Sequence, residues 1–425
     1  MSKLSARDSQ VIWHPYTQAK IGGPPIGIVK AEGVYLTDEN GNQYIDAISS
    51  WWVNLHGHAH PYIAAKVSEQ LLRLEHVIFA GFTHEPAISL AERLLAILPA
   101  NQSKIFYSDN GSTAVEVAVK MALQFWGNKG KPKNRIIALE HAYHGDTFGA
   151  MSVSARGSFT DPFSSLLFDV LRIPFPVKGR EHETIEALKT MISKHRNDVA
   201  AFIIEPLVLG AGGMLMYDAQ VLESMFRVCR DNGILTIADE VMTGFGRTGK
   251  NFACRHIQSK PDIICLSKGI TGGTMPFGVT SCTEEVYNAF LSDDRTRTFF
   301  HGHSYTANPV ACSAALASLD LLLNEACLQN IHSINKLHLE FIESVRSLKY
   351  LKELRCTGTI LALDFMSDSP TSYLNPTRDR LYAHFIKRGI LLRPLGNTIY
   401  IMPPYCITND QLIQVYDAIV ATGKL

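Results

Sequence analysis

The sequence predicts an α/β fold built on a mainly parallel sheet, and three observations support this prediction. Short apolar, β-branched runs of the length typical of buried strands recur through the middle of the chain. Helical patterns separate several of these runs, as over residues 221–231, and this alternation is typical of parallel sheets. Ionisable residues follow four of the runs. The expected strands cover residues 135–139, 201–204, 234–238, 262–266 and 278–281.

The composition is that of a globular protein with a large core. Of the 425 residues, 46% are hydrophobic and 19% are charged. Forty basic residues balance forty acidic ones, so we expect no nucleic-acid partner. The first ten residues are polar and no apolar run reaches the roughly 20 residues that span a bilayer, so we expect no membrane partner and a cytoplasmic location. The eight cysteines include no C-x-x-C pair, which favours reduced, structural thiols.

The first 60 residues are rich in turns and aromatic side chains. Residues 27–45 alternate in polarity around Asn40-Gly41 and predict a hairpin. Trp51 and Trp52 serve either the core or a pocket wall. The three histidines of H-G-H-A-H-P at 56–61 have metal-like alternation, but the glycine and proline favour a loop, so we expect no metal site.

A helix start with anion-binding potential follows a short strand expected at 103–107. The segment S-D-N-G-S-T at 108–113 carries strong helix-starting residues. The free N–H groups of Gly111 and Ser112 suit a phosphate, although helix capping alone explains the same residues.

The polar residues at the strand ends predict the site. The segments that follow the strands are 140–146, Glu205-Pro206, Asp239-Glu240 and Ser267-Lys268. Ligands bind at the carboxyl edge of open α/β sheets, so these groups are expected to share one cleft.

Lys268 and Asp239 match the requirements of pyridoxal 5′-phosphate (PLP). This cofactor needs a lysine for a Schiff base, an acid at its pyridine nitrogen and a phosphate cradle. Asp239 precedes Lys268 by 29 residues, about one strand-crossover-strand unit, which places both at neighbouring strand ends. Tyr143 is an aromatic residue available to cover the ring. A surface lysine at a strand end is the alternative for Lys268.

Residues 244–251 nearly match the phosphate loop G-x-x-x-x-G-K-[ST]. Asn251 replaces the hydroxyl that would reach magnesium, and Asp239 and Glu240 would repel a nucleotide phosphate. The sequence therefore argues against an NTPase.

The chain after about residue 310 is predicted to form a second α+β portion. A long alanine-rich helix begins near Pro309, and strands are expected at 360–365 and 399–402 around a helix at 378–388. We expect residues 1–60 to contribute to a small domain and the pocket, 61–310 to form a large cofactor-binding domain, and 311–425 to complete the small domain.

Several long segments together resemble the class III, fold-type I, PLP-dependent aminotransferases. They are S-D-N-G-S-T-A-V-E-V-A-V-K-M-A, H-A-Y-H-G-D-T-F-G-A-M-S-V, I-I-E-P, A-D-E-V-M-T-G-F-G-R-T-G, L-S-K-G-I-T-G-G-T-M-P and H-G-H-S-Y-T-A-N-P. The resemblance implies a large domain with a mainly parallel seven-stranded sheet and a smaller α+β domain. It also makes residues 244–251 the turn after the Asp239 strand.

The resemblance implies roles for individual residues. Lys268 would form the Schiff base and Asp239 would hold the pyridine nitrogen, while Gly111 and Ser112 would bind the phosphate. Ser304 would reach that phosphate from the second subunit of a homodimer. The residues implied to line the substrate pocket are Tyr16, Trp51, Trp52, Tyr143, Gly302, Arg393 and Tyr400, with Tyr16 also near the chemistry. Arg393 suits a carboxylate, and Arg247 and Glu205 match positions near the site.

A narrower resemblance rests on W-H-P-Y-T-Q, S-S-W-W-V-N-L-H-G-H and L-R-P-L-G-N-T-I-Y-I-M-P-P-Y. It implies amination of 8-amino-7-oxononanoate to 7,8-diaminononanoate in biotin biosynthesis. The amino donor would be S-adenosyl-L-methionine or lysine, because His303-Ser304 stands where many such members carry Pro-Thr. The alternative is another ω-aminotransferase, acting on ornithine, acetylornithine, 4-aminobutyrate or a diamine.

Overall fold

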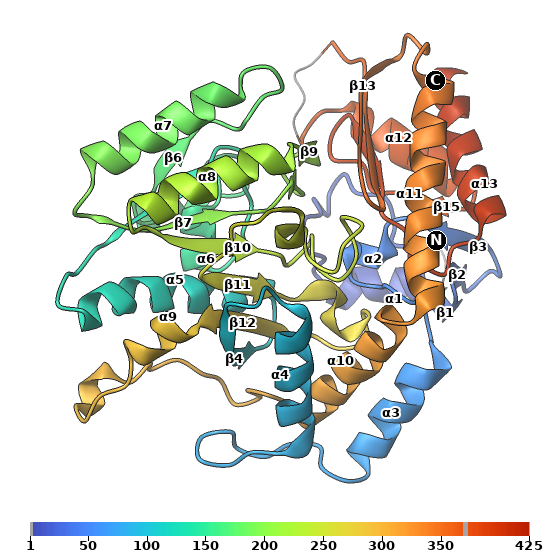
Figure 1. The fold of residues 1–425 in the computed structure, drawn as a ribbon. Coiled ribbons are helices and arrows are strands. Elements are labelled where there is room, and N and C mark those ends of the chain that lie inside the picture. The colour runs from blue at the N-terminus through green and yellow to red at the C-terminus, as the bar shows by residue number, and fades with distance from the viewer. Residues whose placement is uncertain (1–2, 369–372, 425) are drawn as a thin grey trace.

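The computed structural model describes residues 3–368 and 373–424, which form a large α/β unit beside smaller sheets (Figure 1). A seven-stranded sheet has the order β4-β12-β11-β10-β7-β5-β6. Its strands are β4 Gln102–Ser108, β5 Arg135–Leu139, β6 Leu171–Ile173, β7 Val199–Ile204, β10 Leu235–Asp239, β11 Ile263–Leu266 and β12 Gly278–Thr283. Strand β12 runs antiparallel to β11 and β4 and the other pairs are parallel, so the prediction of a mainly parallel sheet is confirmed. The six expected strands are present, whereas β6 was not predicted.

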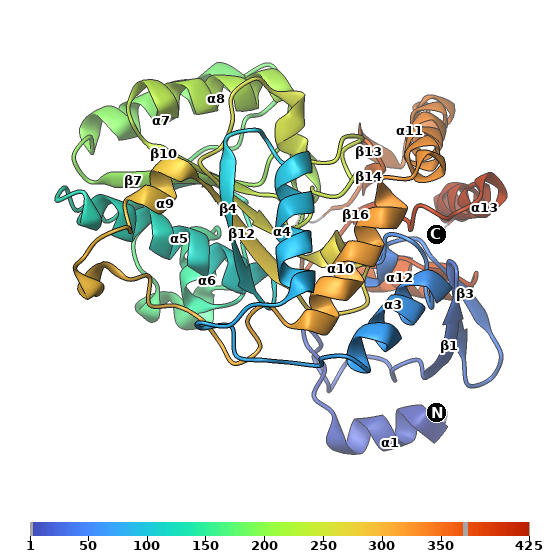
Figure 2. The same cartoon turned by 60° about the horizontal axis from the view of Figure 1, so that its bottom comes forward.

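Helices cover both faces of this sheet, as its apolar strands require. Helices α7 and α8 lie over one face and α5 lies over the other (Figures 1 and 2). Each side has its own buried core, and strands β7, β10 and β11 contribute fully buried residues to both. The helices of this unit are α4 Glu85–Ile97, α5 Gly111–Asn128, α6 Phe148–Val153, α7 Glu181–Lys194, α8 Ala219–Asp231 and α9 Glu284–Asn288.

A four-stranded sheet joins the two ends of the chain. It has the order β1-β2-β3-β15, and β15 (Ile390–Leu391) pairs in parallel with β3 (Gln43–Asp46). The hairpin expected at 27–45 is instead a three-stranded meander with β1 Ile28–Glu32 and β2 Tyr35–Asp38, because Gly33, at φ +56°, makes a second reversal. The turn through Asn40-Gly41 lies where the sequence predicts it.

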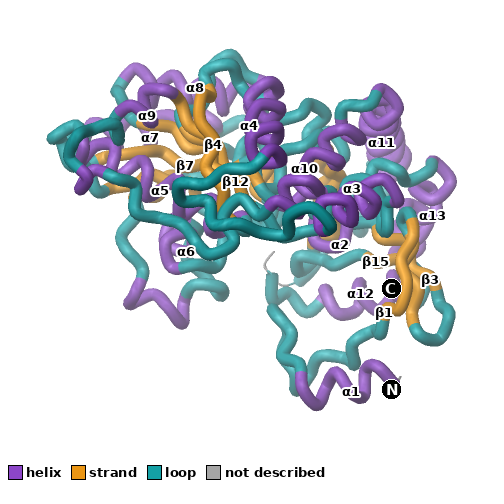
Figure 3. The backbone as a smooth tube through the Cα atoms, turned by 90° about the horizontal axis from the view of Figure 1, so that it is seen from below, coloured by secondary structure: helices purple, strands orange, loops and turns teal. Residues whose placement is uncertain are grey.

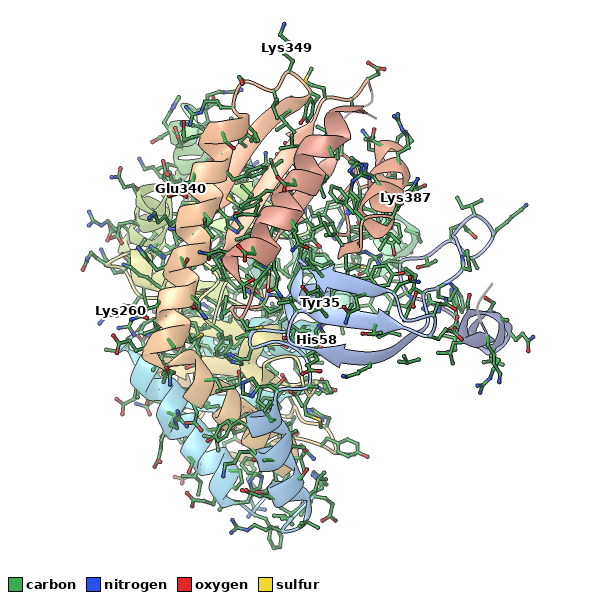
Figure 4. The ribbon with its side chains drawn as sticks, turned by 90° about the vertical axis from the view of Figure 1, so that its right-hand side faces the viewer. Tyr35, His58, Lys260, Glu340, Lys349 and Lys387 are labelled. Carbon is green, nitrogen blue, oxygen red and sulfur yellow. The ribbon has the colours of Figure 1, made fainter. Side chains whose placement is uncertain are left out.

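The C-terminal portion contains a second antiparallel sheet and three long helices. Its sheet has the order β13-β14-β16. Figure 4 shows helix α11, which carries Glu340, and the four-stranded sheet, which carries Tyr35, together in one view. The strands are β13 Leu351–Thr357, β14 Ile360–Phe365 and β16 Thr398–Ile401, and a ribbon of β8 Val208–Leu209 and β9 Leu215–Met216 lies nearby in the larger unit. The remaining helices are α1 Lys3–Val11, α2 Ser49–Trp52, α3 Pro61–Leu71, α10 Pro309–Leu322, α11 Glu325–Val345, α12 Thr377–Ile386 and α13 Asn409–Val420.

Short 3₁₀ turns complete the chain, and α1 lies at the periphery (Figure 3). The 3₁₀ turns are Asp161–Leu166, Ala253–His256, Lys268–Thr271, Arg295–Arg297 and Ala421–Lys424. Within the described ranges no single helix has both the length and the apolar composition to cross a membrane; α10 and α11 meet these criteria only as a pair, bent by 69°.

Candidate active site

A cavity of about 610 Å³ opens at the carboxyl ends of the central strands, where the sequence places the site. Lys268 follows β11, Asp239 ends β10, Glu205 follows β7, and Tyr143 lies on the loop after β5. The start of α5 completes the wall with Gly111 and Ser112. Residues from four strands and one helix thus meet although they lie far apart in the sequence.

Lys268 projects into this cavity from a strained backbone. Its φ of +45° lies in the left-handed region, which is unfavourable for a lysine and is typical of functional sites. Its Nζ lies 5.1 Å from the centre of the Trp52 ring. Burial of the ammonium lowers the pKa of Lys268, against the opposing charges of Asp239 and Glu205. A lowered pKa makes the neutral, nucleophilic amine more accessible.

Asp239 is buried, and both of its carboxylate oxygens are fixed. One oxygen lies 2.7 Å from Nδ1 of His144, and the other accepts the N–H of Val241 at 3.1 Å. The His144 backbone N–H in turn donates to Ser154 Oγ at 2.8 Å. The carboxylate is therefore oriented from two sides and keeps lone pairs for a further donor. His144 lies in the loop that the sequence singled out, but no role was predicted for it.

Glu205 holds the loop that carries Tyr143. Its carboxylate accepts the N–H of Tyr143 and the N–H of Gly210, both at 2.9 Å. Burial raises the pKa of Glu205 to about 7, since these hydrogen bonds offset only part of the desolvation. Glu205 therefore acts on the pocket through the backbone of Tyr143.

The first turn of α5 presents unpaired donors to the cavity. Asn110 caps the helix, with its side chain accepting the N–H of Thr113 at 2.9 Å in a capping box. Among the hydrogen bonds of the described ranges, the N–H groups of Gly111 and Ser112 have no partner. A Cβ at Gly111 would lie 2.7 Å from Val241, so this close approach requires glycine. The cap therefore uses the N–H of Thr113, whereas the N–H groups of Gly111 and Ser112 stay available for an anion.

A second cavity, of about 340 Å³, adjoins the first, and Lys268, Trp52 and Tyr143 line both. Its walls are mostly aromatic, and Arg393 lines it in addition to Lys268. The residues that line it are Tyr16, Trp51, Trp52, Val53, Tyr143, Asp146, Phe159, Ala211, Lys268, Tyr373, Arg393, Leu395 and Tyr400. The structure therefore places Tyr16, both tryptophans, Arg393 and Tyr400 together, as the sequence resemblance implies.

The two tryptophans have different environments. Trp52 is 5% exposed, and its indole N–H donates to the Tyr400 hydroxyl at 2.9 Å. Trp51 is 39% exposed, and the Arg393 guanidinium lies 4.8 Å from its ring centre. Both tryptophans therefore line the cavity, and Trp52 belongs to the buried core as well.

The segment that carries the tryptophans is held by Asp46. Three of its residues, Ser49, Ser50 and Trp52, have positive φ, so α2 is a strained turn rather than a regular helix. The buried Asp46 carboxylate accepts the N–H of Ser50 at 2.6 Å and lies 2.8 Å from Nε2 of His58.

Tyr16 reaches the pocket from the N-terminal segment. Its hydroxyl lies 3.2 Å from that of Tyr143 and donates to the carboxylate of Asp146. Burial is the largest cause that raises the pKa of Tyr16, so the phenol stays protonated at neutral pH.

Three residues implied by the resemblance lie elsewhere. Gly302 and Ser304 are exposed on the connection between α9 and α10, and neither is among the described residues that line the two cavities. Arg247 is buried behind the tryptophan segment and donates to the Pro403 carbonyl oxygen at 2.8 Å. Arg247 therefore has a structural position beneath the pocket. The 244–251 segment that contains it follows β10 and is succeeded by the 3₁₀ turn Ala253–His256, without the α-helix that a phosphate loop requires.

The sequence prediction placed the segment with His144 and Asp146 at the site but gave neither residue a role, and it missed Phe159 and Tyr373. The first two follow a predicted strand, so their position was a usable signal. Phe159 and Tyr373 carry no such signal, because they reach the pocket only through tertiary folding.

Comparisons with known proteins agree over nearly the whole chain. The model of the family described as aminotransferase class-III matches residues 17–422. An adenosylmethionine-8-amino-7-oxononanoate aminotransferase from Synechococcus elongatus is 49% identical over 414 residues, covering 96% of this chain and 97% of the relative. The crystal structure of the Methanocaldococcus jannaschii protein of that name has a TM-score of 0.94 at 36% identity and covers 99% of this chain and 98% of its own. A PLP-bound amine transaminase from an uncultivated Pseudomonas species has a TM-score of 0.92 at 31% identity, covering 97% and 98%.

Proposed function

The chain belongs to the class III aminotransferase family, and from this we propose that it transfers an amino group to 8-amino-7-oxononanoate to give 7,8-diaminononanoate in biotin biosynthesis. The observation that carries the proposal is the single cavity in which Lys268, Asp239 and the start of α5 meet. Curated relatives at 49%, 41% and 37% identity share one name, which favours this substrate over those of other ω-aminotransferases.

The cavity suits PLP in the chemistry of its donors. The free N–H groups at the start of α5 would hold the phosphate, and Tyr143 would cover the ring. Asp239, oriented by His144 and Val241, would hold the pyridine nitrogen protonated. When bound, PLP supplies an electron-withdrawing ring joined to the carbon that loses or gains the amino group.

Lys268 would bind the cofactor aldehyde covalently and then act as the general base and acid. Its lowered pKa favours a neutral amine that removes a proton from the substrate carbon and returns it elsewhere. Asp146 is the carboxylate among the described residues that line the second cavity, and it suits the cationic amino group of a substrate. Tyr16 would keep that carboxylate in place.

The second cavity would hold the acceptor chain. Its aromatic walls suit a long aliphatic segment, and Arg393 presents a planar guanidinium to the distant carboxylate. Trp52 and Tyr400 would form the wall between these two ends.

The active unit would be a homodimer with a shared phosphate site. The connections α3–α4 and α9–α10 run along one side of the molecule (Figure 2), linked where Asn308 donates to the Glu75 carbonyl oxygen at 3.0 Å. Several of their apolar side chains are exposed, and such patches mark interaction sites. These residues are Ile78, Phe82, Phe300 and Tyr305. Ser304 lies in this surface and would reach the phosphate of the partner.

The test is the visible spectrum of the PLP-loaded protein with S-adenosyl-L-methionine or lysine added separately. We expect one donor to bleach the cofactor band and 8-amino-7-oxononanoate to restore it, with 7,8-diaminononanoate as the product. The donor that bleaches the band is one that the enzyme uses in the first half-reaction. Failure of the oxononanoate to restore a bleached band, with restoration by a different ω-oxo acid, would replace the proposed acceptor.

A further inference from the structure

The guanidinium of Arg393 is held by aromatic side chains. Its Nη2 donates to the Tyr373 hydroxyl at 3.3 Å, and its carbon lies 4.8 Å from the Trp51 ring centre. Among the ion pairs formed within residues 3–368 and 373–424, Arg393 has no carboxylate partner. An arginine fixed in a pocket by neutral groups keeps its full charge for a ligand.

Tyr373 is itself fixed from two sides. Its ring packs edge-on against Phe159 with centroids 4.9 Å apart, and the Arg378 guanidinium lies 4.8 Å from the ring centre. Phe159 in turn packs against Tyr16 at 5.7 Å. The position of the Tyr373 hydroxyl is therefore set by packing that does not depend on Arg393.

The hydrogen bonding of the described residues leaves the Tyr373 hydroxyl proton free for a ligand. Arginine is only a donor, so the Tyr373 oxygen accepts in this bond, and its own O–H has no acceptor among residues 3–368 and 373–424. The same holds for Tyr400, whose oxygen accepts the Trp52 indole N–H at 2.9 Å. Both phenols line the cavity that Arg393 lines. Arg393 and Tyr373 thus present adjacent donors at one end of the cavity, and Tyr400 adds a third donor to its wall, which matches the several lone pairs of a carboxylate.

We propose that Tyr373 determines specificity for the carboxylate of the acceptor by orienting Arg393 and donating its own O–H to that group. This inference rests on the proposed function, because it assigns the Arg393 end of the cavity to the acceptor. A mobile arginine attracts any anion. A guanidinium that a tyrosine hydroxyl holds in one orientation instead favours a planar carboxylate that lies in the guanidinium plane. Tyr373 is accordingly a positioning residue for Arg393 as well as a ligand-binding one.

The experiment compares Tyr373→Phe with wild type as PLP-loaded enzymes. The substitution keeps the ring between Phe159 and Arg378 and removes only the hydroxyl. We expect KM for 8-amino-7-oxononanoate to rise about tenfold, as for a lost hydrogen bond to a charged group, with kcat within about twofold. The rate at which the amino donor bleaches the cofactor band should not change. Tyr350→Phe, which removes a hydroxyl bonded to Val420 outside the pocket, is the matched control.

A binding measurement separates orientation from general loss of the pocket. By calorimetry on the loaded enzyme, wild type should bind nonanoate more tightly than nonanamide, and Tyr373→Phe should reduce this preference about tenfold. An unchanged KM and an unchanged preference would overturn the role of Tyr373 while leaving the proposed function intact. If Tyr373→Phe lowered both the rate of the donor reaction and the melting temperature, Tyr373 would have a structural role, and the proposed specificity role would also be overturned. If wild type aminates no oxononanoate, the proposed function itself fails.

Discussion

Asp239 is an acidic residue of the pocket whose two carboxylate oxygens are both fixed. His144 and the N–H of Val241 hold its two oxygens, and the side chain is buried at the end of β10. A carboxylate held in this way needs no reorganisation when a cationic nitrogen approaches it. The function of Asp239 therefore depends on its charge more than on its shape.

Asp239→Asn should keep the cofactor and lose turnover. Asparagine preserves the size and its single oxygen can still accept the Val241 N–H, but its amide nitrogen is a donor and it has no charge to keep a ring nitrogen protonated. We expect PLP absorbance to be retained and kcat to fall by roughly a hundredfold or more. Asp231→Asn, an exposed change at the end of α8, is the control and should have no effect on either quantity. Full turnover by the Asp239 variant would remove the assigned role.

Glu205 should give the protein a pH-dependent stability. Burial raises its pKa from the ordinary 4.5 to about 7, so the folded state holds the proton more tightly than the unfolded state. Its contribution is therefore fully present below pH 4.5 and is lost as the pH rises to about 7, a change of about 3 kcal/mol. Glu205→Gln removes this titration. We expect the melting temperature of the variant minus that of wild type to increase between pH 5 and pH 7.5 and to be constant above pH 7.5.

The control for this series is Glu186→Gln, which alters an exposed glutamate paired with Lys189 on α7. Its melting temperature should follow that of wild type at every pH. A Glu205 variant that also follows wild type would show that the buried carboxyl titrates normally.

At the scale of elements, two aspartates of one sheet allow a matched comparison. Asp46 holds the tryptophan turn by accepting the Ser50 N–H, and Asp38 holds the neighbouring turn by accepting the N–H groups of Asn40 and Asn42. Either change to asparagine removes charge-assisted hydrogen bonds and should cost about 1–3 kcal/mol of stability. Only Asp46→Asn should also raise KM for the acceptor, because Trp51 and Trp52 follow that turn. Equal KM values in the two variants would show that the turn held by Asp46 does not influence substrate binding.

Local patterns in the sequence predict most elements but few of the contacts between them. The strands that end at Asp239 and Leu266 follow from short β-branched runs, and the start of α5 follows from its capping residues. Pairing of β3 with β15 carries no local signal, since nearly 350 residues separate them. Tyr373 was missed for the same reason: its function depends on packing against Phe159 and Arg393 from distant segments.

At the scale of the whole molecule, both ends of the chain serve one pocket. We propose that residues 1–60 and 311–425 form the small domain, and the β3–β15 pairing supports this division. The 61–310 portion carries Lys268 and Asp239, while the small domain supplies Trp52 and Arg393. Relative movement of the two portions would change the substrate end of the pocket more than the cofactor end.

The proposed sharing of the phosphate site between two subunits predicts that two inactive variants restore each other. Lys268→Ala removes the reactive amine, and Ser304→Glu places a negative charge where a hydroxyl is proposed to reach the phosphate of the partner. Each homodimer should be inactive, with PLP weakly held by the Ser304 variant. In a mixed dimer, the site with an intact Lys268 receives its Ser304 from the Lys268→Ala subunit, so that site is complete. Random re-pairing of equal amounts should therefore recover about a quarter of wild-type activity, because half the dimers are mixed and each has one working site.

The measurement is activity after the two variants are co-expressed with different affinity tags and the doubly tagged dimer is isolated. That species should have about half of the wild-type activity per dimer. If Ser304 served its own subunit, one site of the mixed dimer would lack the lysine and the other would carry the glutamate, so no activity would return. Co-expression of Lys268→Ala with Asp239→Asn is the control, because both changes lie in one subunit's cavity on the 61–310 portion, and mixing them leaves every site defective.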